Sequence, residues 1–149
     1  MSTLFGVPIQ IPDSWEDRSL YRFVVPRDAG LAVRMRPQAG DAPRFSSNVL
    51  VSKHAIPEDS SLTALLSAGS EEQQQQDPSY QQLDAGTWTH EGQDAAFLDT
   101  TFFVADPGLQ LFQRRVAVRC AKGEMVVFTI TSDKQDLAAL ATKMGLVTH

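Results

Sequence analysis

The sequence predicts an α+β fold, an antiparallel β-sheet of about six to seven strands with two main helices packed on one face. Alternation of apolar and polar residues, the period of a strand, dominates residues 82–131. Turn residues divide that stretch at regular intervals, as in a meander of hairpins. Only two segments show the three- and four-residue apolar spacing of a helix.

The first third of the chain carries weaker strand patterns. Pro8 interrupts the first of them and predicts an edge or bulged strand, because proline cannot donate to the ladder. Prolines, a glycine and serines over residues 36–47 predict a loop. The early strands are expected over residues 4–11, 20–25, 31–35 and 48–54.

The two helices have recognisable ends. The first is expected to begin after an N-cap at Ser60 or Ser61 and to end near Gln76, ahead of a proline. The second is expected to be capped by Ser132-Asp133 and to end at Gly145. Their helical spacing comes from Leu62, Leu65 and Leu66 in the first segment, and Leu137, Leu140 and Met144 in the second.

The four predicted meander strands cover residues 83–90, 95–104, 109–120 and 124–131. Two helices can cover only one face of this sheet, so the other face must meet solvent, a loop, a second subunit or a ligand. Alternation assigns a mixed apolar and polar set to that second face. Two interpretations stay open, a partly solvated face and an adaptable partner-binding surface. The candidate partner-binding residues are Phe103, Gln113, Arg115, Met125, Val127 and Thr129.

Composition limits the classes of function. The chain has 149 residues, 42% hydrophobic and 21% charged, which fits one globular domain over residues 1–149. Its net charge of −5 argues against non-specific nucleic-acid binding, which needs a basic surface. The start of the chain lacks the pattern of a signal peptide, and no apolar run is long enough to cross a membrane, so we expect a soluble cytoplasmic protein. The single cysteine, Cys120, is expected in the core.

Catalytic patterns are missing from the sequence. His54, His90 and His149 have no second metal ligand at short spacing, and we expect neither a metal nor a cofactor. Asp99 lies within an apolar strand, where pairing with Arg115 or Arg119 is a better interpretation than a general base. We therefore expect a protein that is not an enzyme.

Several segments together resemble the DcrB-related family. The opening Ile11-Pro12-Asp13-Ser14-Trp15, the strand from Ser47 to Ser52, and Ile56-Pro57 ahead of a leucine- and glutamine-rich helix follow that family's pattern. Pro78 and Tyr80, the strand with Gln113-Arg114, and the closing helix continue it. Two features depart from it, a serine at position 14 where glycine is usual, and a long insert over residues 35–45.

The resemblance implies a PsbP/DcrB-like fold and, among cytoplasmic members of this length, a similarity to the Eag chaperones of type VI secretion. These bind apolar N-terminal helices of effectors and shield them before export. For this chain the resemblance implies a non-enzymatic chaperone or adaptor, a homodimer, whose client helix lies on the uncovered sheet face. The alternative is a binding or scaffold module of the same fold, with another protein or a small hydrophobic ligand as its partner.

Overall fold

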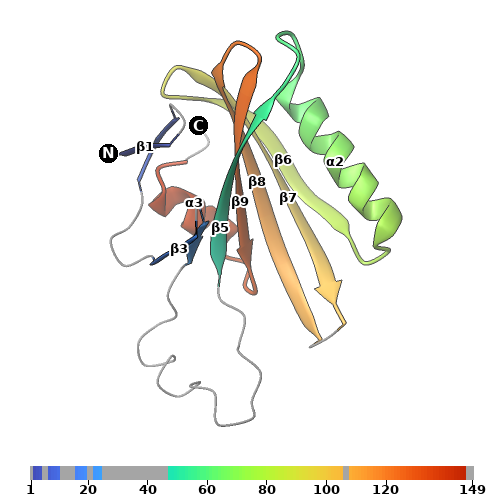
Figure 1. Ribbon diagram of the computed structural model, residues 1–149. Helices are drawn as coiled ribbons and strands as arrows, with labels where there is room; N and C mark the ends of the chain where they lie inside the picture. Colours follow the sequence, from blue (N-terminus) through green and yellow to red (C-terminus); the bar gives the residue numbers. More distant parts are fainter. Residues whose placement is uncertain are drawn as a thin grey trace.

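A computed structural model describes residues 2–4, 7–10, 16–19, 22–24, 47–105 and 108–146. Nine strands and two helices lie within these ranges (Figure 1). The strands are β1 (Ser2–Leu4), β2 (Val7–Ile9), β3 (Glu16–Ser19), β4 (Arg22–Val24), β5 (Asn48–Ala55), β6 (Gln81–His90), β7 (Gln93–Val104), β8 (Leu109–Ala121) and β9 (Glu124–Ser132). The helices are α2 (Leu62–Gln76) and α3 (Leu137–Lys143).

Seven of these strands form one antiparallel sheet in the order β3-β4-β5-β9-β8-β7-β6. The four strands β6 to β9 are consecutive hairpins, and β5 joins the sheet beside the last of them. The remaining two, β1 and β2, pair only with each other. The α+β class and the expected number of strands are confirmed. The strand expected over residues 31–35 lies outside the described residues.

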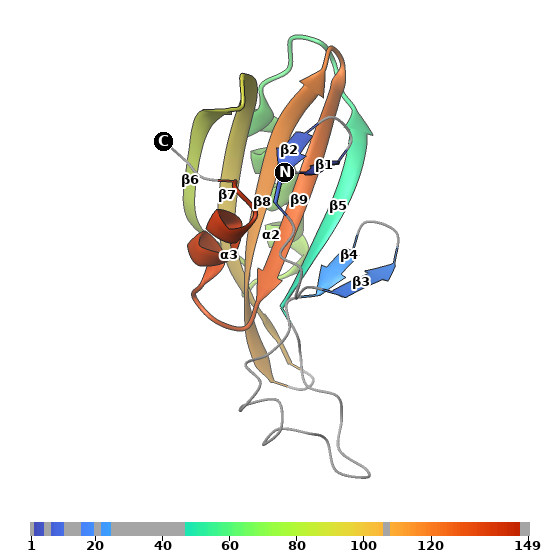
Figure 2. The same ribbon diagram turned by 90° about the vertical axis from the view of Figure 1, so that its left-hand side faces the viewer.

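The two helices lie on opposite faces of the sheet, which corrects the expectation that they share one (Figure 2). Alternation explains the difference, because strands β7 to β9 carry apolar side chains on both faces. On the first face, α3 packs against larger side chains that include Val116, Phe128 and Ile130. On the second face, α2 packs against smaller ones that include Ala96, Ala117 and Val127. A sheet that is apolar on both sides needs a cover on each.

Strand β2 completes the cover on the α3 face. Val7 and Ile9 are buried in the same core as α3. The backbone N–H of Gln10 donates to the Met144 carbonyl at 2.7 Å, and His90 Nε2 donates to the Pro8 carbonyl at 2.5 Å. His90 is buried, and this contact fastens β2 to the end of β6.

Polar residues next to each helix determine where the helix begins. Ser61 is the N-cap of α2, and its hydroxyl accepts from the Ala64 N–H at 3.3 Å, as predicted. Helix α3 begins later than expected, with Asp136 as its N-cap. The cause is a polar turn, in which the Ser132 hydroxyl donates to Asp136 Oδ1 at 2.6 Å and accepts from the Lys134 N–H at 3.1 Å. Ser132 thus closes strand β9 before the helix starts.

Candidate partner-binding surface

The strand register gathers five of the six predicted residues on the α2 face. Residues directly opposite each other in an antiparallel pair share a face. Arg115 lies opposite Thr129, and Gln113 lies opposite Thr131, the next residue along this face of β9. The five residues that share the face are Gln113, Arg115, Met125, Val127 and Thr129.

Phe103 does not belong to this group. It lies opposite Gln110, which shares a face with Arg114 and therefore points to the α3 side. The sequence assignment failed because it fixed the faces of each strand separately, without the register between β7 and β8. Phe103 is half exposed on that other side.

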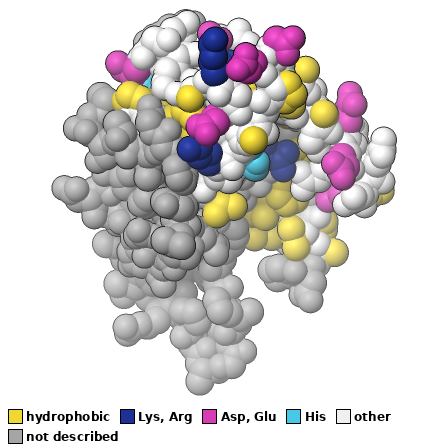
Figure 3. All heavy atoms as spheres, turned by 45° about the horizontal axis from the view of Figure 1, so that its top comes forward, with side chains coloured by type: hydrophobic (Ala, Val, Ile, Leu, Met, Phe, Trp, Pro, Cys, Tyr) yellow, Lys and Arg dark blue, Asp and Glu magenta, His cyan; other side chains and the backbone are white. Residues whose placement is uncertain are grey.

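Helix α2 covers only part of its face. It contacts β6, β7 and β8, and Leu62 and Leu66 are its buried apolar residues. The neighbouring strands β9 and β5 extend beyond it. We call their incompletely buried residues on this face the open strip, which consists of Asn48, Leu50, Ser52, His54, Met125 and Thr129. Figure 3 shows hydrophobic side chains gathered in a hollow of the surface that it presents. Among the described residues, the face that was predicted to be uncovered is thus covered in part, by α2.

Leu50 is the most exposed apolar member of the open strip and was missed by the sequence reasoning. It is 46% exposed, although Val49 and Val51 on either side are buried. Its partner across the ladder is Thr129. The alternation in β5 was available as a signal, because a leucine between two buried valines must point to the opposite face.

Arg115 lies where the helix meets the open strip. Its Nη2 donates to Gln73 Oε1, in the second half of α2, at 2.7 Å. A Cβ built on Gly69, one turn earlier, would lie 3.6 Å from Nη1. Beside it, Gln113 Nε2 donates to the Thr131 hydroxyl at 3.1 Å. The border between α2 and the open strip is therefore polar.

Asp99 pairs with Arg114, which corrects the predicted pairing with Arg115 or Arg119. Two parallel hydrogen bonds join them, Nε to Oδ1 at 2.7 Å and Nη2 to Oδ2 at 2.8 Å. The guanidinium carbon also lies 4.4 Å from the centre of the Phe97 ring. The two residues are directly opposite in the ladder, whereas Arg115 points to the other face. This buried pair is structural.

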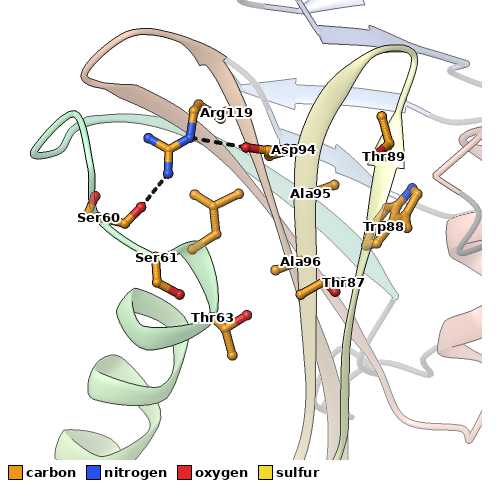
Figure 4. Close-up of a pocket in the computed structure, with 11 residues that line it drawn as sticks. Ser60, Ser61, Thr63, Thr87, Trp88, Thr89, Asp94, Ala95, Ala96 and Arg119 are labelled. Carbon is orange, nitrogen blue, oxygen red and sulfur yellow. Dashed lines mark hydrogen bonds and ion pairs between the residues drawn. The ribbon is translucent and has the colours of Figure 1, made fainter.

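A shallow pocket of about 410 Å³ lies at the start of α2. Figure 4 shows Arg119 between Ser60 and Asp94. Arg119 donates to the Ser60 carbonyl and to the Glu58 carbonyl, and its Nε lies 3.8 Å from Asp94 Oδ2. The lining otherwise consists of short polar or apolar side chains and Trp88, without a histidine or cysteine. A nucleophile activated by a neighbouring base is not assembled in this pocket.

Other predicted features fall into three groups. Within the described ranges, no cluster of three or more metal-ligating side chains occurs, and no helix is long and apolar enough to span a bilayer. His54 is exposed and shares a 2.8 Å hydrogen bond with Ser52, and Cys120 is half-buried beside the α3-face core. Trp15, the loop over residues 35–45 and His149 lie outside the described residues.

Comparison with known proteins gives a family and a fold. A family model described as DcrB matches residues 8–145. A Pseudomonas aeruginosa protein of unknown function, described as a putative regulator, has a similar structure, with 20% identity, 89% of this chain and 85% of that chain covered, and a TM-score of 0.57. No curated protein matches the sequence.

Two further solved structures are similar. The Ran-binding protein Mog1p of Saccharomyces cerevisiae has 13% identity, with 93% of this chain and 77% of that chain covered, and a TM-score of 0.53. The cyanobacterial PsbP of Synechocystis has 17% identity, with 64% and 60% covered, and a TM-score of 0.45. At this identity the similarity to Mog1p establishes the fold alone.

Proposed function

The chain belongs to the DcrB family, and we propose that it is a non-enzymatic chaperone or adaptor that binds an apolar helix of a protein partner along the open strip. The single observation that carries this proposal is the incomplete cover of the α2 face. Strands β5 and β9 present Leu50, Met125 and Thr129 there, next to polar groups at the edge of α2. Recognition of a helix in a groove needs such a combination of apolar floor and polar border.

The dimensions of the open strip suit a helix. Strand β5 has eight residues, which gives a length of about 26 Å at about 3.3 Å per residue. A helix of about 17 residues has the same length. This is close to the length of the apolar segment that crosses a bilayer, about 20 residues. The length suits an apolar client helix, and the resemblance to the Eag chaperones implies which one. The proposed client is an apolar N-terminal segment of a type VI effector, shielded in the cytoplasm before export by a homodimer of this chain.

The test compares two leucines of similar exposure in different places. Leu50 is 46% exposed in the open strip, and Leu83 is 51% exposed in β6, the edge strand next to β7 at the other end of the sheet. The full chain is co-expressed with a carrier protein fused to a leucine- and alanine-rich helix of about 20 residues. The complex is then isolated and analysed by size exclusion with light scattering.

We expect Leu50→Glu to lower recovery of the carrier at least tenfold, because a charge in the apolar contact must be desolvated. Leu83→Glu serves as the matched control and should leave recovery unchanged. Loss with both variants, or with neither, contradicts a site on the open strip. If the wild-type chain never retains the carrier, the helix-binding function itself is wrong.

The alternative function is a binding or scaffold module for a different partner. One observation favours it, since Ser52, His54 and Thr129 make much of the open strip polar. A structural neighbour is named a Ran-binding protein, so this fold is also found in a protein that binds a folded partner. A small hydrophobic ligand is the other possible occupant. Under this alternative, Leu50→Glu impairs binding of a folded protein or a fatty acid while the Leu/Ala helix is never retained.

A further inference from the structure

Arg115 carries a charge that meets no counter-charge among the described residues. It is half-buried, and its one hydrogen bond to a described residue, from Nη2 to Gln73 Oε1, is to a neutral amide. Within the described ranges, no carboxylate lies within ion-pair distance of it. A guanidinium has five N–H donors, so most of its capacity is unused by Gln73.

The other two arginines of β8 are different. Arg114 forms a bidentate pair with Asp99 on the α3 face. Arg119 shares the α2 face with Arg115 and is joined to two backbone carbonyls and to Asp94. Strand β7 thus supplies carboxylates to Arg114 and Arg119, whereas Arg115 meets an amide of α2.

The position of Arg115 directs this charge toward a partner. Its ladder neighbour on β9 is Thr129, a member of the open strip, and Leu50 follows on β5. Arg115 is therefore two strands from the most exposed apolar residue of the open strip, on the same face. A helix lying on the open strip would therefore pass beside Arg115.

We propose that Arg115 selects clients whose apolar helix carries one acidic side chain, which pairs with the guanidinium at the border of α2. This inference rests on the proposed function and specifies the chemistry of its client. A carboxylate in an otherwise apolar helix is costly to leave unpaired, and a half-buried arginine is the partner suited to it by charge and bidentate geometry. Burial of the client carboxylate against Arg115 strengthens the interaction relative to a pair in water.

The experiment measures binding of two synthetic helices to the full-length chain. Both are leucine- and alanine-rich, about 20 residues long, and held in the same detergent below its micelle concentration. They differ at one central position, Glu in one and Gln in the other. We expect the Glu helix to bind the wild-type chain about tenfold more tightly, the effect of one hydrogen bond to a charged group.

Three variants separate recognition from a structural role of Arg115. Arg115→Met should abolish the preference for the Glu helix and leave binding of the Gln helix within about twofold. Arg119→Met, the matched control on the same face, should keep the full preference. Gln73→Leu removes the hydrogen bond between α2 and Arg115 and should also keep it. Thermal melting establishes that each variant is folded.

The outcomes distinguish this inference from the proposed function. Equal binding of both helices to the wild-type chain overturns the acidic-client inference and leaves helix binding intact. A preference that survives Arg115→Met overturns the assignment to Arg115. Absence of binding by either helix overturns the proposed function, and this inference with it.

Discussion

The two faces of the sheet are built from the same strands and are closed in different ways. On the α3 face, helix α3 and strand β2 cover a core of large side chains, including Val116, Phe128 and Ile130, all fully buried. On the α2 face, a weakly apolar helix rests on alanines and Val127 and leaves the open strip beside it. The difference indicates that the first face contributes more to stability, and it supports the proposal that a partner binds on the second.

The strongest test of this difference is to truncate one large buried side chain on each face in turn. Phe128→Ala on the α3 face should lower the free energy of unfolding by about 3–5 kcal/mol, because it leaves a large cavity in a core closed on all sides. Leu66→Ala in α2 should lower the free energy of unfolding by about 2 kcal/mol, since the helix can move toward the sheet and fill part of the cavity. Chemical denaturation of both variants measures the two values. Equal losses would contradict the distinction between the faces.

The buried ion pair gives the next largest effect. Asp99→Ala should cost about 3 kcal/mol, because Arg114 is left buried without its counter-charge. The matched control, Asp94→Ala, removes an exposed carboxylate from Arg119 and should change stability by less than about 0.5 kcal/mol. Urea denaturation compares them. A small loss for Asp99→Ala would mean that the α3 face is not rigid around this pair.

Two glycine-to-alanine substitutions compare how tightly the two faces are packed. A Cβ on Gly86 would lie 2.6 Å from Phe97 Cε1, whose ring is held against Arg114, so Gly86→Ala should destabilise by about 1–2 kcal/mol. Gly69→Ala meets only an ordinary contact with Arg115 at 3.6 Å and should stabilise helix α2 by about 0.5–1 kcal/mol. Thermal melts should therefore shift in opposite directions. A shift in the same direction would show that the α2 face is packed as tightly as the other.

The smallest effect on stability is expected in the open strip. Leu50→Ser should change the free energy of unfolding by no more than about 0.5 kcal/mol, because its side chain is nearly half exposed and lies outside the buried core. Differential scanning calorimetry against the wild-type chain measures it. A loss above about 1.5 kcal/mol would mean that Leu50 belongs to the core and is not available to a partner.

Much of the fold could be predicted from local patterns. The meander strands, the Ser61 cap and the end of α2 follow from alternation, turn residues and capping, which act over a few residues. The side of the sheet on which each helix packs could not be predicted, because β7 to β9 are apolar on both faces. The start of α3 also depends on a contact between Ser132 and Asp136 that competes with capping.

The candidate site was predictable in part. Alternation within β8 and β9 correctly placed five residues on one face, since every second residue of a strand points to the same side of the sheet. Phe103 was assigned to the wrong face because the register between β7 and β8 decides which of their residues share a face. The sequence of one strand does not reveal that register. The partner of Asp99 was missed for the same reason. The unpaired charge of Arg115 appears only once its neighbours in three dimensions are known.

The most direct test of the central claim, that a partner helix lies on the α2 face, uses the methionine methyl groups as reporters. Met125 belongs to the open strip, whereas Met144 is fully buried in the core of the α3 face. Methyl NMR spectra of the full chain are recorded with and without the Leu/Ala helix that carries a central Glu. We predict that the Met125 resonance shifts or broadens on binding while that of Met144 stays in place. Perturbation of Met144 with Met125 unchanged would place the partner on the opposite face and contradict the proposed site.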